Sequence, residues 1–181
     1  MNLDEVIKTP KGPRERNVAS AYRERFSDPH EGNLYVRYQE LTSLAGCPKT
    51  VTGTFDCQIN YLTSLIGGPS HVNKSYNAAH NKLVSLVGGP RFVGGNFSVL
   101  ENPTLLSLTN VHKHLGTIKG MFLCEKKTNM LGLILIPGVT AFEFPREMEL
   151  QNIFNTHLND RDVYALQQAL LDAGYIEQAR L

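Results

Sequence analysis

The sequence has no tryptophan, three cysteines and few charged residues. Charged side chains make up 19% of the 181 residues, below the roughly 25% of typical soluble domains. Hydrophobic residues, at 41%, are enough for a packed core, which excludes a disordered chain. The cysteines, Cys47, Cys57 and Cys124, are odd in number and lack CxxC spacing. We therefore expect neither a disulfide framework nor a zinc knuckle, and a reducing cytoplasm suits these thiols.

Long apolar segments and an excess of charge of one sign are also absent. The longest apolar run, residues 133–136, has four residues, against the roughly 20 needed to span a bilayer. The first thirty residues lack the apolar core of a secretion signal. We therefore expect no membrane partner and a cytoplasmic location. The formal charge is +1, so no global field favours nucleic acid as the partner.

The sequence does contain a repeat. Asn60, Asn81 and Asn102 recur with a 21-residue period. Six further columns keep this period: Leu41, Leu62 and Leu83; Leu44, Leu65 and Leu86; Gly46, Gly67 and Gly88; Pro48, Pro69 and Pro90; Val51, Val72 and Val93; and Leu34, Phe55, Tyr76 and Phe97. One shared period indicates an array of equivalent coils. In the longer fourth unit Leu115 takes the valine position, and the register is lost after Gly116.

Each unit predicts one short strand. Phe55 and Cys57 alternate with Thr54, Asp56 and Gln58, so one strand face points into the interior. Such a strand cannot bury this face alone, but parallel strands stacked about 4.8 Å apart share one core. The Gly-Gly-Pro segment supplies the return turn. The predicted fold is an α/β solenoid with a short parallel β-sheet and a turn-rich convex side.

We expect three regions, because a solenoid exposes its core at both ends unless these are covered. Residues 1–31 form an N-terminal helical cap, residues 32–144 the solenoid, and residues 145–181 a C-terminal helical cap. The first cap contains a helix over residues 14–26. In the second, a helix begins at Asn159 and ends before Gly174. That helix either buries the last coil or docks to a partner.

Charge and apolar patterns allow predictions for two further parts of the chain, one before and one after the repeats. Residues 8–25 hold six basic and two acidic side chains, which is typical of a solvated cap face or of a phosphate-binding arm. Residues 131–137 predict another strand, and Phe142 and Phe144 alternate as in a strand that closes the array.

The repeated asparagines have two interpretations. A side-chain amide can bind a ligand. Alternatively, an inward-pointing asparagine that follows a strand can bond the backbone of its own coil and of the adjacent coil. We favour the structural role. Gln39 takes this position in the first unit.

The repeat resembles a leucine-rich repeat. The family's core, L-x-x-L-x-L-x-x-N-x-L, falls on Phe55, Cys57, Asn60 and Leu62, and again one unit later on Tyr76, Ala78, Asn81 and Leu83. The first leucine is the departure, because Val51 lies one position early.

A closer resemblance involves two motifs of the second unit. The segments N-x-L-x-S-L-x-G-x-P at residues 60–69 and G-x-F-x-C at residues 53–57 look like those of short leucine-rich repeat proteins encoded by tailed bacteriophages. This resemblance implies the solenoid and a location in the host cytoplasm. It implies no activity, because that group is mostly without assigned function.

No reactive group of residues accompanies the repeat. Cys57 has Asp56 beside it but occupies an inward position, which favours an inert buried thiol over a nucleophile. His112 and His114 would share one face of a strand, and two ligands are too few for zinc. The sequence has no P-loop, no dinucleotide-binding motif and no G-x-S-x-G elbow. We expect a protein that is not an enzyme and needs no cofactor or metal.

The outward positions of the strands remain as the candidate site. Stacking places them in rows, and the expected partner-binding residues on this concave face are Tyr35, Arg37, Asp56, Gln58, Asn77, His80 and Ser98. Tyrosine and arginine commonly anchor protein interfaces. The leading hypothesis is a non-enzymatic protein-binding module, which would dock on a host factor if the phage resemblance holds. The alternatives are a structural or self-assembling phage component, forming a homo-oligomer, and nucleic-acid binding through residues 8–25.

Overall fold

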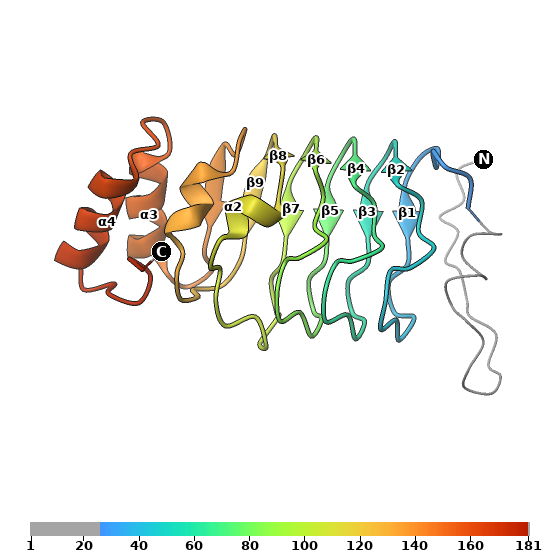
Figure 1. Ribbon diagram of the computed structural model, residues 1–181, viewed down its shortest axis with the longest axis horizontal. Coiled ribbons are helices and arrows are strands. Elements are labelled where there is room, and N and C mark those ends of the chain that lie inside the picture. The colour runs from blue at the N-terminus through green and yellow to red at the C-terminus, as the bar shows by residue number, and fades with distance from the viewer. Residues whose placement is uncertain (1–25, 181) are drawn as a thin grey trace.

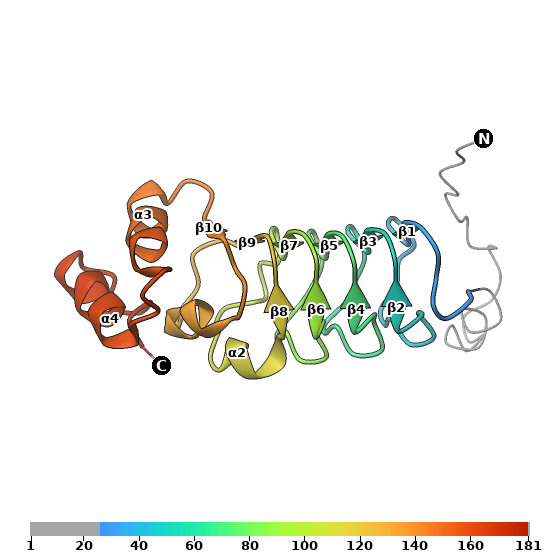
Figure 2. The same cartoon turned by 90° about the horizontal axis from the view of Figure 1, so that it is seen from above.

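The chain forms a parallel β-solenoid whose coils stack along one nearly straight axis (Figures 1 and 2). The computed structural model describes residues 26–180. The predicted N-terminal helix and the basic segment at residues 8–25 lie outside the described residues. Among the residues described, no helix is both long and apolar enough to cross a membrane.

Two parallel sheets run along the solenoid. The larger sheet contains, in spatial order, β1 (Leu34–Tyr35), β3 (Phe55–Asp56), β5 (Tyr76–Asn77), β7 (Phe97–Ser98), β9 (Met121–Leu123) and β10 (Ala141–Glu143). The smaller sheet contains β2 (Thr50–Val51), β4 (His71–Val72), β6 (Phe92–Val93) and β8 (Thr117–Ile118). Each strand pairs with the equivalent strand of the neighbouring coil. The predicted solenoid of stacked parallel strands is confirmed.

The smaller sheet lies where the sequence predicted turns alone. Val51, Val72 and Val93 are fully buried, whereas the preceding residue of each strand faces outward. The valine column lies one position early for the leucine-rich repeat pattern. It is therefore the buried column of the smaller sheet. The prediction of a single sheet was wrong because each strand of the smaller sheet buries one valine or isoleucine, and no apolar residue two positions away completes an alternating pattern.

An aromatic column fills the interior behind the larger sheet. Phe55, Tyr76 and Phe97 are at most 1% exposed. Their rings meet edge to face, with centroids 4.9 Å apart for the first pair and 5.3 Å for the second. Phe122 and Phe142 continue the column. The predicted alignment of these side chains is confirmed, and it joins all the coils in one core.

The repeated asparagines hold the corner that follows each strand of the larger sheet. The Nδ2 group of Asn81 donates hydrogen bonds of 3.1–3.2 Å to three carbonyl oxygens, those of Ala78, Ala79 and, in the preceding coil, Cys57. Its Oδ1 atom accepts a hydrogen bond from the amide of Leu62 at 3.0 Å. Asn60 and Asn102 repeat these contacts. The predicted structural role is confirmed.

This asparagine ladder ends in a different residue on each side. Gln39 takes the position in the first coil, and its backbone amide donates to Oδ1 of Asn60 at 3.0 Å. At the other end, Lys127 stands 25 residues after Asn102 and donates from Nζ to the carbonyl oxygen of Asn102 at 3.2 Å. Its side chain is 8% exposed and lies 3.3 Å from Oε2 of Glu125. The charge buried at this end is therefore paired.

One coil is longer than the others. Phe97 pairs with Phe122, a step longer than the repeat period, and the additional residues form the short helix α2 (Val111–His114). Val93 pairs with Ile118, so the predicted register of Leu115 was wrong. His112 and His114 lie on this helix and not on a strand.

The chain after β9 becomes helical. Residues of the predicted strand at 131–137 form the 3-10 helix η1 (Leu131–Leu135), whose first four residues are all buried. The strand prediction was wrong because an apolar run buried on every side carries no period of two. Two α-helices follow β10, α3 (Met148–His157) and α4 (Val163–Asp172). Their buried side chains, Leu150, Phe154, Leu166 and Leu170, belong to the common core.

The ends of α4 differ in part from the prediction. Asp162, rather than Asn159, caps its N-terminus, because its Oδ1 atom accepts hydrogen bonds from the amides of Tyr164 and Ala165 at 2.9 and 3.0 Å. Gly174 follows the helix with a φ of +81°, a conformation that glycine adopts without steric cost. The predicted C-terminal glycine is confirmed.

Replacing Asn81 by alanine should lower the free energy of unfolding by roughly 3 kcal/mol, because several buried backbone groups then lose their partner. Urea denaturation followed by circular dichroism measures this change. Asn73 is exposed and serves as the matched control, for which Asn73→Ala should change stability little. A loss below about 1 kcal/mol for Asn81→Ala would contradict the structural role of the ladder.

Replacing Tyr76 by phenylalanine should stabilise the protein by about 1 kcal/mol. Among the described residues, the buried hydroxyl of Tyr76 has no oxygen or nitrogen partner, and its neighbour is the thiol of Cys57, a weak hydrogen-bonding group. The equivalent positions in both neighbouring coils are phenylalanine. Thermal unfolding compares this variant with Tyr61→Phe, because Tyr61 is 51% exposed and its hydroxyl reaches water. Equal melting temperatures for Tyr76→Phe and the unmodified chain would show that the hydroxyl carries no cost.

Candidate functional site

The outward residues of the larger sheet form a continuous row. Strand register places Tyr35 beside Asp56, Asp56 beside Asn77, and Asn77 beside Ser98. This is the row that the 21-residue period predicts. Leu123 follows next, because the longer coil extends the step beyond that period.

Five of the seven expected site residues form one polar network along this row. Arg37 lies 5.2 Å from the ring centre of Tyr35, and its Nη1 atom lies 3.7 Å from Oδ2 of Asp56. Gln58 donates to Oδ2 of Asp56 at 3.3 Å and accepts a hydrogen bond from Nδ2 of Asn77 at 3.2 Å. Each of these side chains therefore contacts a neighbour in the row without any partner bound.

Asp56 is the most buried member of this network. Its exposed fraction is 6%, although the sequence places it on the outward face. Burial raises the pKa of this carboxyl, while the hydrogen bond from the backbone amide of Gln58 and the charge of Arg37 act in the opposite direction. Asp56 thus orients Arg37 and Gln58 and offers a partner little surface of its own.

The other two expected residues, His80 and Ser98, line a hollow of about 430 Å³ at the C-terminal half of the face. The hollow brings together eight further residues, namely Gln58, Asn77, Ala79, Leu100, Glu101, Glu125, Pro145 and Arg146. Tyr35 and Arg37 lie outside it, nearer the N-terminal end of the sheet.

Sequence reasoning missed three charged residues of this hollow. Glu101 could have been found, because it stands one repeat period after His80 and shares its left-handed backbone, with φ of 54° and 53°. The backbone amide of Glu101 donates to Glu125. Glu125 and Arg146 follow the irregular coil, so no period in the sequence places them near the row.

The thiol of Cys57 does not reach this face. Cys57 is fully buried, and burial raises its pKa well above that of a free thiol. Its Sγ atom donates to the carbonyl oxygen of Asn77 at 3.4 Å. Within residues 26–180, no group of three or more histidine, cysteine, aspartate or glutamate side chains could hold a metal ion.

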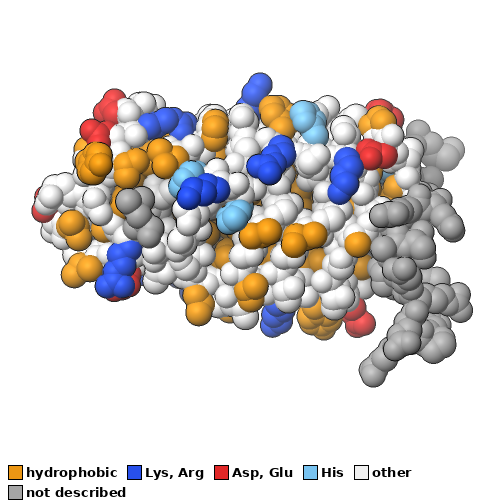
Figure 3. All heavy atoms as spheres, viewed as in Figure 1, with side chains coloured by type: hydrophobic (Ala, Val, Ile, Leu, Met, Phe, Trp, Pro, Cys, Tyr) orange, Lys and Arg blue, Asp and Glu red, His pale blue; other side chains and the backbone are white. Residues whose placement is uncertain are grey.

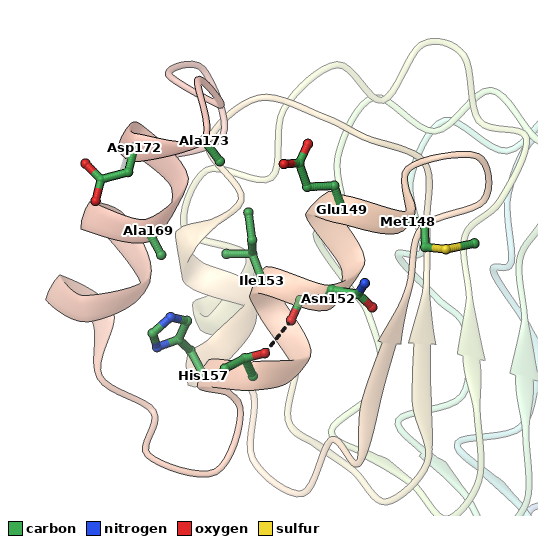
Figure 4. A pocket seen from close by; sticks show the side chains of 9 residues that line it. Met148, Glu149, Asn152, Ile153, His157, Ala169, Asp172 and Ala173 are labelled. Carbon is green, nitrogen blue, oxygen red and sulfur yellow. Dashed lines mark hydrogen bonds between the residues drawn. The ribbon is translucent and has the colours of Figure 1, made fainter.

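A second concavity, of about 760 Å³, lies between α3 and α4 (Figure 4). Ile153 points into the space between the helices, and Glu149 and Asp172 stand at its rim. Met148, at the start of α3, is 76% exposed, and its side chain points away from α4 (Figure 4). This groove is apolar at its base and acidic at its edges.

Comparison with known proteins gives no relative, because no protein family, curated protein or solved structure matches the chain. The function must therefore be argued from the geometry of these surfaces.

Replacing Asp56 by asparagine should stabilise the protein at pH 7. Asn77 shows that an asparagine fits the equivalent position, where its Oδ1 atom accepts a hydrogen bond from the amide two residues later, as Asp56 does. Because burial raises the pKa of Asp56, the folded state binds its proton more tightly than the unfolded state, and stability falls as the pH rises through the folded pKa.

The gain from Asp56→Asn should therefore be present at neutral pH and shrink as the pH falls toward the ordinary carboxyl range. Urea midpoints measured across this range test the sign, with Asp160→Asn as an exposed control. A variant that is less stable at pH 7 would mean that the Arg37 pair outweighs the burial of the charge.

Proposed function

We propose that the chain is a non-enzymatic protein-binding module that holds another protein on the outward face of the larger sheet. The observation that carries the proposal is the network from Tyr35 to Asn77, which fixes amide, guanidinium and aromatic groups in one row. Groups ordered in advance lose little side-chain entropy on binding, so more of their interaction energy contributes to affinity.

The hollow beside this row supports the same function. It presents His80, Ser98 and the amides of Gln58 and Asn77 to one space, so a protruding side chain of a partner would meet several hydrogen-bonding groups at once. Arg37 and Tyr35 lie beyond the hollow and are suitable anchors at the edge of the interface. A standard interface of about 800 Å² per partner would cover most of this face.

The resemblance of the repeat supports a proposal about the origin of the partner. The 21-residue unit and its N-x-L-x-S-L segment support a short leucine-rich repeat protein of the phage-encoded kind, with helical caps at its ends. A host protein in the cytoplasm is the partner that this origin favours.

Self-assembly is the second candidate, and the C-terminal helices favour it. Large apolar side chains are exposed on and beside α3 and α4: Met148 (76%), Tyr164 (83%), Leu171 (43%) and Ile176 (58%). Paired helices from two copies would cover them. Light scattering at micromolar concentration separates the two candidates, because a monomer contradicts self-assembly.

Affinity capture with three baits tests the protein-binding function. The unmodified chain and a control with lysines at the exposed turn positions Thr63 and Val84 should retain the same protein from a host lysate. The double variant Gln58→Ala with Ser98→Lys should lose at least about 90% of it, because it breaks the network and fills the hollow. Capture that is equal with all three baits would remove the larger sheet as the binding face.

A further inference from the structure

Charge is segregated along the solenoid although the whole chain is nearly neutral. Residues 57–124 contain five lysine or arginine residues and a single carboxylate, Glu101. On the face that carries α2, basic side chains and histidines lie over the central coils, and acidic side chains lie toward the two ends (Figure 3). The formal charge of +1 therefore conceals a basic central region.

A separate set of basic side chains lies around the smaller sheet, which runs along the upper edge of Figure 1 and faces the viewer in Figure 2. We define the cationic strip as residues 49–53, 70–74, 91–95 and 116–120, the four segments that contain and flank β2, β4, β6 and β8. These segments hold no aspartate or glutamate. They hold four lysine or arginine residues, one from each coil, namely Lys49, Lys74, Arg91 and Lys119.

All four cations are exposed. Within residues 26–180, none of them forms an ion pair. This contrasts with Lys127, which is buried and paired with Glu125. Unpaired cations from successive coils, without carboxylates between them, concentrate positive potential on one face.

The cations alternate across the strip. Lys49 and Arg91 precede their strands, whereas Lys74 and Lys119 follow theirs. Since parallel strands lie about 4.8 Å apart, successive cations along the axis stand on opposite margins of the strip. A linear polyanion lying along the axis would meet a positive charge alternately on its two sides.

Aromatic and hydroxyl groups occupy the middle of the strip. The rings of His71 and Phe92 stack with centroids 4.4 Å apart and an interplanar angle of 12°. Nζ of Lys119 lies 5.4 Å from the centre of the Phe92 ring. Thr50 and Thr117 extend this row on either side in the same register.

The strip is bounded at its N-terminal end. Asp28 accepts a hydrogen bond from the amide of Thr50 at 3.1 Å, and Glu31 accepts one from the hydroxyl of Thr52 at 3.1 Å. These carboxylates would repel a polyanion that extended past the first coil. The bound segment would therefore be short and centred on β4, β6 and β8.

We propose that the cationic strip binds single-stranded nucleic acid. Both faces of the Phe92 ring are occupied, by His71 and by Lys119, so the exposed ring of His71 is the aromatic group open to a base. Cations that follow a backbone, combined with an aromatic contact for bases, are the two elements of sequence-tolerant single-strand binding. An acidic peptide would use the cations but would gain little from the stacked rings. A duplex is disfavoured, because the strip presents no helix or protruding ribbon to a groove. This surface is separate from the larger-sheet face, so the two proposals fail independently.

Fluorescence anisotropy with labelled oligothymidine and oligouridine of about ten nucleotides tests the proposal. The full chain should bind both at low salt, with affinity falling as salt rises at a slope of about −2 to −3, as expected for up to four contacts to a single strand. Replacing all four strip cations by glutamine should weaken binding at least about 30-fold. His71→Ala should weaken it about tenfold, because it removes the exposed ring that a base can contact.

The matched control replaces four exposed cations outside the strip by glutamine: Lys82, Lys113, Lys126 and Arg146. It should bind at least about tenfold more tightly than the strip variant. Circular dichroism should confirm that both variants fold, since none of the strip cations is buried.

Three outcomes would overturn the proposal: no binding at low salt, equal losses in both variants, or binding retained by the strip variant, which would favour residues 8–25. Equal competition by polyglutamate, with no effect of His71→Ala, would assign the strip to acidic protein segments instead.

Discussion

The structure depends on the polar groups of the corner after each strand of the larger sheet. At Ile59 and His80 the backbone adopts φ near +54°, turning the chain away from the sheet and leaving carbonyl groups directed inward. Those carbonyls would be costly to bury without partners. One amide per coil satisfies them, and because Asn81 also bonds Cys57 and Leu62 of the preceding coil, the same side chain fixes the register between coils.

Fixed register is what gives the two outer faces their chemistry. With each coil locked to the next, every outward position is repeated along the axis at the spacing of parallel strands. On the larger sheet this repetition joins Asp56, Gln58 and Asn77 into a polar network in which Arg37 pairs with the charge of Asp56. On the smaller sheet it stacks His71 on Phe92 and sets one cation in each coil. One internal constraint thus supports two surfaces that differ in charge and can be altered separately.

The sequence predicted what is periodic. The stacked aromatic column, the role of the asparagines and the row from Tyr35 to Ser98 all follow the 21-residue period, so spacing alone placed them. The second sheet was not predicted because each of its strands buries a single valine or isoleucine, with no apolar residue two positions away to show alternation. The register after the longer coil was not predicted, because α2 contains additional residues that interrupt the 21-residue period. The position of Asp56 on the outward row was predicted from the period. Its burial was not predicted, because strand alternation does not report the contacts that Arg37 and Gln58 make with its carboxylate.

The residues that end the asparagine ladder make the length of the molecule adjustable. Gln39 and Lys127 each contact an asparagine of the adjacent coil, and the intermediate coils repeat the same contacts. Inserting a further copy of one internal unit would therefore leave both terminal junctions intact and lengthen the rod by about 4.8 Å. The length of each outer face, and so the length of a linear polymer that it could contact, would then change in steps of one coil with the number of units inserted.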